Sequence, residues 1–194
     1  TQADAIIEIA AVRFNGHRVE AEWSSLINPG RPIPPMITQL TGITNEMVRN
    51  APPMRAILND LADFVGAAPV VGHNVGFDLS LLQGYNILKL NEVVDTYELA
   101  AVLLPTSSRY NLGTLGQQMG ILIPNSHRAL DDARLAHAVF TRLYDKTLAL
   151  PLELLAEFVR LSEPLEWGAG WLFEQVLRAR VRQPIPPRRA APSN

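Results

Sequence analysis

The sequence contains no cysteine and no apolar run of the length that a membrane-spanning helix needs. The absence of cysteine excludes a disulfide scaffold and metal sites built on thiolates. The absence of an apolar run of about 18–20 residues excludes a transmembrane helix. Neither absence fixes the compartment, for which we expect the cytoplasm. With 194 residues, 47% of them apolar, the chain can form one domain with a proper core and an appendage.

Basic residues are scarce over most of the chain. The net charge is −2, but residues 175–194 contain five arginines and no acidic residue, so residues 1–174 carry a net charge of −7. A basic patch on the main part of the chain is therefore not evident. Nucleic-acid phosphates would have to be attracted by bound cations, by local arginines or by the arginine-rich tail.

The most informative stretch, residues 127–133, reads His-Arg-Ala-Leu-Asp-Asp-Ala. Apolar residues recur at helical spacing after it and predict an amphipathic helix over 129–146. Asp131 and Asp132 fall in the first turn, where the helix dipole favours carboxylates. His127 precedes that turn, so it and a carboxylate could hold a metal and deprotonate a water. Helix capping and solvated charge explain the same pattern.

A second informative stretch is residues 69–82. The apolar run 70–72 predicts a short buried strand, and Asn74 is a good N-cap for the helix that follows. Asp78 then lies one turn into that helix, near the carboxyl end of a strand, where open α/β sheets have their sites. The residues expected to form the buried stripe of this helix are Phe77, Leu81, Tyr85 and Leu88.

In combination, Gly-His-Asn-Val-Gly-Phe-Asp at 72–78 and the motif at 127–133 resemble two motifs of the DEDD-type 3′–5′ exonucleases. The resemblance is to the histidine, or DnaQ-like, subgroup. This family includes the proofreading subunits of bacterial replicative polymerases and the N-terminal exonuclease domains of DinG-type helicases. The resemblance covers roughly residues 4–146, with supporting matches at Ile6–Val12, Asn28–Gly30, Leu40–Thr44 and Val94–Thr96.

The resemblance implies an α/β fold similar to ribonuclease H, with a mixed sheet flanked by helices. It also implies hydrolysis of phosphodiester bonds at single-stranded 3′ ends, of DNA rather than RNA, with two Mg²⁺ or Mn²⁺ ions. Asp78 and Asp132 would bind the metal ions, and His127 would be the general base. The residues expected to contact the substrate are Leu40, Thr41, Asn74 and Phe77.

The amino-terminal end departs from the family pattern. A hairpin is predicted over 6–27 by its Asn-Gly turn, whereas the family has a central strand before this hairpin. That strand carries an Asp-x-Glu motif, which supplies two of four metal-binding carboxylates. Residues 1–4 hold no such motif, and Asp4 and Glu8 match structural acids of the family instead. Because a sheet without its central strand exposes unpaired edges, we expect residues before Thr1 to supply it.

The chain is expected to comprise an exonuclease-like domain over 1–147, a helical extension over 148–182 and a Pro/Arg-rich linker or tail over 183–194. Two other functions remain open. One is a catalytically inert binding module within a helicase or polymerase, and the other is an RNA-trimming enzyme similar to oligoribonucleases. An Asp-x-Glu motif just upstream of Thr1 would favour an enzyme, and its absence a degenerate, inert module. A helicase or polymerase partner could lie in the same polypeptide chain or in the same complex.

Overall fold

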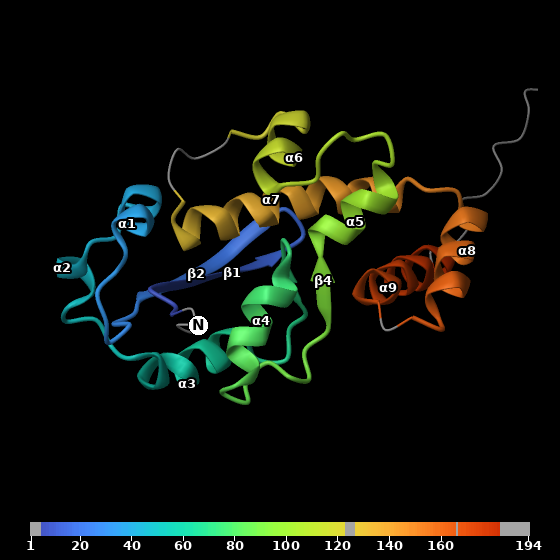
Figure 1. The fold of residues 1–194 in the computed structure, drawn as a ribbon. Coiled ribbons are helices and arrows are strands. Elements are labelled where there is room, and N and C mark those ends of the chain that lie inside the picture. Colours follow the sequence, from blue (N-terminus) through green and yellow to red (C-terminus); the bar gives the residue numbers. More distant parts are fainter. Residues whose placement is uncertain (1–4, 123–126, 166, 183–194) are drawn as a thin grey trace, which may run out of the picture.

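The computed structural model describes residues 5–122, 127–165 and 167–182 (Figure 1). These residues form two small β-sheets surrounded by helices. The segment preceding residue 5 and the tail expected over 183–194 lie outside the described residues. Within the described ranges, no helix is both long and apolar enough to cross a bilayer.

The first sheet is a hairpin of β1 (Glu8–Asn15) and β2 (Arg18–Leu26). The strands pair antiparallel, from Glu8 opposite Leu26 to Asn15 opposite Arg18. Gly16 adopts a φ of 56° in the turn, a conformation that glycine adopts without steric cost. The hairpin predicted from the Asn-Gly signal is therefore confirmed.

The second sheet contains β3 (Val70–Gly72) and β4 (Val93–Asp95), which pair in parallel. Helix α4 (Val75–Gln83) lies in the connection between them. No described strand joins this sheet to the hairpin. The α/β architecture expected from the sequence is confirmed, with its sheet split into two in the described residues; β1 and β3 line the same cavity.

Helix α7 (Ala129–Leu148) bridges the two sheets by packing on both β1 and β3 (Figure 1). Its position confirms the helix predicted over 129–146. Asp131 and Asp132 lie in its first turn and Lys146 in its last, an arrangement that complements the helix dipole. The buried residues of its apolar stripe include Leu135, Ala136, Val139, Phe140 and Leu143.

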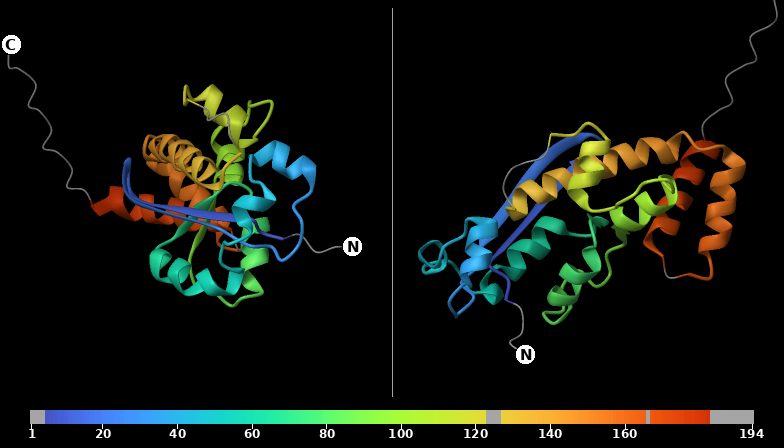
Figure 2. Two further views of the ribbon diagram at one scale, coloured as in Figure 1. Left: turned by 90° about the vertical axis from the view of Figure 1, so that its left-hand side faces the viewer. Right: turned by 45° about the horizontal axis from the view of Figure 1, so that its top comes forward.

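The opposite side of the sheets is covered by α3 (Met54–Val65) and α4, as the views in Figures 1 and 2 agree. Ile57 and Leu61 of α3 pack in one core cluster with Ile27 and Leu82. Two shorter helices precede α3; they are α1 (Pro35–Thr41) and α2 (Asn45–Val48).

The remaining helices pack around β4 and the second half of α7. They are α5 (Thr96–Leu103), α6 (Leu112–Gln118), α8 (Leu152–Ser162) and α9 (Gly168–Arg182). Leu155 of α8 and Phe173 of α9 are fully buried in the same core cluster as Val94 of β4. A Cβ on Gly168 would lie 1.5 Å from the carbonyl oxygen of Val93. Glycine therefore permits α9 to begin directly against β4.

Candidate active site

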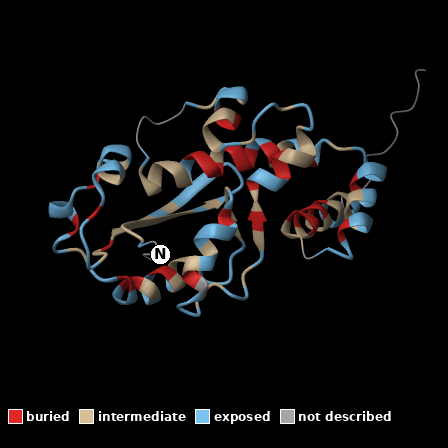
Figure 3. Ribbon diagram, in the orientation of Figure 1, coloured by how far each residue is buried: buried red, intermediate tan, exposed pale blue. Residues whose placement is uncertain are grey.

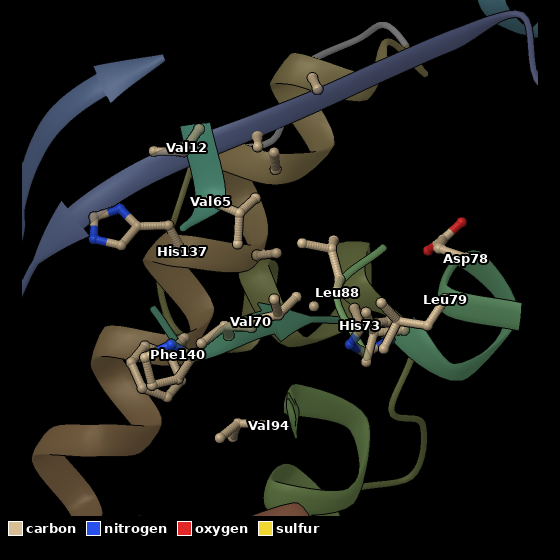
Figure 4. Close-up of a pocket in the computed structure, with 18 of the residues that line it drawn as sticks. Val12, Val65, Val70, His73, Asp78, Leu79, Leu88, Val94, His137 and Phe140 are labelled. Atoms are coloured by element: carbon tan, nitrogen blue, oxygen red, sulfur yellow. The ribbon is translucent and has the colours of Figure 1, made fainter. Parts of the chain in front are cut away.

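A cavity of about 680 Å³ lies between β1 and β3 (Figure 4). Most of its lining is apolar, and its acidic lining residues are Glu8, Asp78 and Asp132. These three residues come from β1, α4 and α7 respectively. The fold therefore brings two of the predicted metal-binding carboxylates, which are 54 positions apart in the sequence, to one cavity.

Asp78 lies in the first turn of α4, and the beginning of this helix is fixed by Asp95 at the end of β4. The Oδ1 and Oδ2 atoms of Asp95 accept hydrogen bonds from the backbone N–H groups of Asn74 (2.9 Å) and Val75 (3.0 Å). Burial raises the pKa of Asp78 above its ordinary value, and the negative charge of Asp95 raises it further.

Two expectations for α4 are wrong. Asn74 is at the N-cap position, but it has a left-handed φ of 53° and its side chain makes no capping hydrogen bond. Asp95, which comes from the neighbouring strand, makes the bonds that Asn74 was expected to make. The expected buried stripe is also wrong, because Phe77 is 60% exposed whereas Val75 and Leu82 are buried.

Asp132 lies in the first turn of α7, and His127 lies just before its N-cap residue, Arg128. Burial raises the pKa of Asp132, while the nearby His127 opposes this shift and the charges of Asp131 and Glu8 add to it. His127 itself is exposed to solvent. An exposed imidazole near a half-buried carboxylate can reach a substrate and exchange a proton with water.

Glu8 anchors the start of α7 to the start of β1. Its carboxylate accepts hydrogen bonds from Arg128 Nη2 (2.6 Å) and Nε (3.1 Å), and from the backbone N–H of Ala129 (2.8 Å). The Glu8 side chain is only 8% exposed. The family pattern makes Glu8 a structural acid, but the sequence gives no signal for its partner Arg128, because no local pattern relates residues 120 positions apart.

We expect Glu8→Ala to lower the free energy of unfolding by about 2 kcal/mol, because it leaves the Ala129 N–H and the Arg128 guanidinium without their acceptor. Thermal and urea unfolding would measure the loss. Glu22→Ala is a matched control, since Glu22 also lies on the hairpin and pairs with an arginine of α7, Arg134, but in an exposed position. The expectation is contradicted if both variants lose the same stability.

His73 is a half-buried histidine that lines the cavity. Its Nδ1 lies 2.9 Å from the Thr96 hydroxyl, which donates to the Gly72 carbonyl oxygen at 3.1 Å. Because the hydroxyl proton is used in that bond, His73 Nδ1 must be the donor to Thr96. Burial lowers the pKa of His73, which favours the neutral ring. This geometry gives His73 a hydrogen-bonding role at the end of β3.

The four residues predicted to contact a substrate differ in how far their side chains are exposed to solvent. Leu40 on α1 and Phe77 on α4 are 53% and 60% exposed, and Asn74 is also exposed. Thr41 is half-buried, and its hydroxyl donates to the Ile37 carbonyl and accepts from the Ile43 N–H. Its side chain therefore stabilises the end of α1, whereas the other three side chains are accessible.

The donor chemistry of the cavity fits a hard divalent cation. Asp78 and Asp132 provide carboxylate oxygens, the ligands that Mg²⁺ and Mn²⁺ prefer. Burial raises the pKa of both carboxyls, and a bound cation would favour their charged forms. Within the described ranges, no group of three or more His, Cys, Asp or Glu residues could hold a metal. In the part of the chain that the structure describes, Asp78 and Asp132 are therefore two carboxylates at one cavity and not by themselves a metal site.

The raised pKa of Asp78 predicts how the stability of the metal-free protein depends on pH. When the pKa of a carboxyl is higher in the folded than in the unfolded state, its protonated form stabilises the fold. This stabilisation is fully present at pH values below the unfolded pKa of 3.8. This contribution is lost as the pH rises through the folded value. We therefore expect Asp78→Asn to have a higher Tm than the unmodified protein at pH 7 in EDTA, and a similar Tm near pH 3.

Thermal unfolding across this pH range tests the prediction, with Asp60→Asn as the control because Asp60 is a carboxylate on α3 that does not line the cavity. A Tm of Asp78→Asn that is lower than that of the unmodified protein at pH 7 would contradict it. Added Mn²⁺ should raise the Tm of the unmodified protein and have less effect on Asp78→Asn.

Comparison with known proteins identifies similar sequences over most of the chain. The RNase T family, described as exonuclease, matches residues 1–140. The chain is 34% identical over 168 residues to the 3′–5′ exonuclease DinG of Bacillus subtilis, covering 84% of this chain and 18% of that protein. It is 36% identical over 149 residues to the DNA polymerase III subunit epsilon of Treponema pallidum, covering 73% and 69% of the two chains.

Solved structures share the fold. Exonuclease X in complex with 5′ overhanging duplex DNA matches with a TM-score of 0.60 and 26% identity, over 73% of this chain and 83% of that chain. The nuclease domain of 3′hExo, a DEDDh family member bound to rAMP, matches with a TM-score of 0.63 and 17% identity, over 72% and 80%. The chain thus spans less than a fifth of the DinG relative but most of these two nuclease structures.

Proposed function

The chain belongs to the RNase T and DnaQ-like family of DEDDh exonucleases, and from this premise we propose that it removes nucleotides from single-stranded 3′ ends. The reaction is metal-dependent hydrolysis of phosphodiester bonds, with DNA as the preferred substrate. The observation that carries the proposal is the presence of Asp78 and Asp132 at one cavity, with His127 close enough to influence the pKa of Asp132.

In the proposed mechanism, Asp78 and Asp132 hold Mg²⁺ or Mn²⁺. Such ions, when bound, activate a water and stabilise charge on the phosphoryl group. An imidazole nitrogen of His127 accepts the proton of the attacking water, and the exposed ring then releases this proton to solvent. Glu8 keeps this arrangement in place, because it ties the start of α7 to β1.

The exposed apolar side chains provide the proposed contact with unpaired bases. Leu40 and Phe77 present apolar surface to solvent from α1 and α4. Bases of a single strand can stack on such surfaces without sequence preference, because every base has a flat apolar face. Asn74 provides an amide for hydrogen bonding beside Phe77, while Thr41 acts by holding the end of α1.

The names of the relatives support DNA as the substrate. The Treponema relative is a DNA polymerase subunit, and the structure of exonuclease X contains duplex DNA. In relatives such as DinG of Bacillus subtilis and PolC of Thermotoga maritima, the matched region is 18% and 13% of the whole protein. We therefore propose a helicase or polymerase, in the same chain or complex, as the partner of this domain.

An assay with 5′-labelled DNA and RNA oligomers tests the proposed activity. In Mn²⁺ or Mg²⁺, we expect products that shorten stepwise from the 3′ end, with single-stranded DNA degraded faster than RNA or blunt duplex. EDTA should stop the reaction. Equal rates on RNA would contradict the DNA preference, and no product with any substrate or ion would contradict the enzymatic proposal.

A second candidate function is a catalytically inert module that binds nucleic acid or protein within a helicase or polymerase. One observation favours it: the described residues supply two exposed or half-buried carboxylates but no complete set of metal ligands. The module would bind single-stranded oligomers without hydrolysing them. Gel-shift and cleavage measurements on the same oligomers distinguish the two candidates.

A further inference from the structure

Helix α8 has a second apolar face, which is exposed to solvent in the part of the chain that the structure describes. Its first face is in the core, where Leu155 is fully buried in the same cluster as Phe173 of α9. Leu154 and Leu161, in contrast, are 40% and 50% exposed, and Leu165 in the turn after the helix is 59% exposed. Figure 3 shows mostly exposed residues along α8, beside the more deeply buried first turns of α9.

The exposed leucines belong to a row with the spacing of a helix-pairing surface. The members of this row, which we call the α8 seam, are Leu154, Phe158, Leu161 and Leu165. Steps of four, three and four residues place all of them along one side of a helix, as in the contact rows of coiled coils. The turn after α8 continues the helical path, since the Leu165 N–H donates to the Ser162 carbonyl oxygen at 2.9 Å. The seam therefore has the pattern that one further helix would cover.

The α8 seam is held in place by packing on the other side of the helix. A Cβ on Gly170 of α9 would lie 2.5 Å from the Cβ of Ser162, so the two helices approach closely at this point. Phe158 also packs on Phe173 of α9, with 5.0 Å between the ring centroids. The seam is thus a preformed surface, and a preformed surface loses less conformational freedom when it binds a partner.

The charges beside the α8 seam are acidic. Residues 152–163 carry a net charge of −2. Glu157 lies three residues after Leu154 and four before Leu161, so it is a direct neighbour of the seam on the helix surface. The single arginine of this segment, Arg160, donates hydrogen bonds to both Glu157 oxygens, at 2.5 and 2.9 Å. The surplus of negative charge beside the seam favours a partner with positive charge.

We propose that the α8 seam is a docking site for one amphipathic helix that has an apolar stripe and a basic flank. Docking of the apolar face of a helix on an apolar surface is an established mode of peptide recognition, in which side chains at helical spacing are the anchors. The basic residues of the partner lie over Glu157 and its acidic neighbours. A second copy of α8 would bring two acidic flanks together, and nucleic-acid phosphates and anionic lipids are repelled by the same charge.

The α8 seam is separate from the candidate active site. Among the described residues, those that line the cavity come from other elements than α8. The match to the RNase T family covers residues 1–140, whereas α8 begins at Leu152. The docking site therefore goes beyond the proposed nuclease function and does not rest on it.

A synthetic peptide of about 18 residues tests the docking site, because isolated helices shorter than this are marginal in water. It has leucines at alternating steps of three and four residues and lysines beside them, and a second peptide has glutamates in place of the lysines. Fluorescence anisotropy of each labelled peptide measures its affinity for the unmodified protein, Leu161→Ser and Glu157→Lys. Leu152→Ser is the matched control, since Leu152 is 39% exposed on the same helix but lies outside the seam. Thermal unfolding checks that each variant is folded.

We expect the lysine peptide to bind the unmodified protein, and Leu161→Ser and Glu157→Lys to weaken this binding by about 10-fold or more. Leu152→Ser should leave the affinity unchanged, and the glutamate peptide should bind more weakly than the lysine peptide. No binding of the lysine peptide, or equal affinities of Leu161→Ser and the unmodified protein, would overturn the proposal.

Light scattering of the protein without peptide distinguishes the other occupant. A dimer that Leu161→Ser dissociates would identify a second copy of the chain on the seam and would also overturn the proposal. None of these measurements depends on hydrolysis, so their outcome is independent of whether the chain is an active nuclease.

Discussion

Replacing Asp132 with alanine is expected to lower the rate of 3′-end hydrolysis by on the order of 10³-fold or more, because metal-based charge stabilisation is worth several kcal/mol. Asp132 lines the cavity together with Asp78, and burial already raises its pKa. In the proposed mechanism it is a metal ligand, so the variant should also lose Mn²⁺ affinity. Rates on labelled single-stranded DNA and calorimetric Mn²⁺ titration measure the two effects.

Asp131→Ala is the matched control for this prediction. Asp131 is the adjacent acid in the same helical turn, and its removal changes the net charge equally, but its carboxylate pairs with Arg134 at 3.2 Å. We expect this variant to keep most of its activity and its Mn²⁺ affinity. Unchanged Mn²⁺ affinity in Asp132→Ala, or equal losses in both variants, would remove Asp132 from the metal site.

The second large effect is expected for His127→Ala, which should lower the turnover number by roughly 10²–10⁴-fold, the usual contribution of a general base. Metal binding should be largely retained, since His127 is exposed and is proposed to act on the water and not as a metal ligand. The Mn²⁺-dependent rise in Tm should therefore match that of the unmodified protein. Added imidazole should restore part of the rate.

His17→Ala is a suitable control for His127→Ala. His17 is also exposed, but it lies at the hairpin turn and pairs with Asp145 at 3.1 Å. We expect this variant to hydrolyse DNA at the rate of the unmodified protein. Hydrolysis at that same rate by His127→Ala would exclude His127 as the base.

The sequence was most informative where structure is local. The apolar spacing after His127 predicted α7 to within two residues of its observed end at Leu148. The Asn-Gly pair predicted the hairpin of β1 and β2. The N-cap of α5 is equally local, since the side chain of Asp95 accepts from the Tyr97 N–H. Such features depend on residues a few positions apart, and their signals lie in the sequence itself.

Features that depend on distant residues could not be predicted in the same way. Asp95 also caps α4, from 20 positions further along the chain, and this second function displaced the expected cap at Asn74. The predicted buried stripe of α4 was wrong because an aromatic side chain such as Phe77 is apolar whether it is buried in the core or exposed on the surface. The residue type alone does not distinguish the two positions. The start of α9 at Gly168 has no local signal, because glycine normally disfavours helix.

The residues of the candidate site could be predicted from the sequence, but the contacts that hold them in place could not. The motifs named Asp78, His127 and Asp132, and the structure places the two carboxylates at one cavity with His127 near Asp132. Their roles remain predictions. The ion pair of Glu8 with Arg128 has no signal in the spacing, because it arises from the packing of α7 across β1.

The double use of Asp95 has a consequence for protein engineering. Because both carboxylate oxygens fasten the first turn of α4, and Oδ1 also accepts from the first turn of α5, Asp78 is oriented from β4 and not from the connection at residues 84–92. That connection carries Leu90, which is 99% exposed. Leu90 is accordingly the tolerant insertion point, where a foreign loop or affinity tag can be grafted, whereas Leu88 lines the cavity and Asn91 donates to the Gly66 and Ala68 carbonyls.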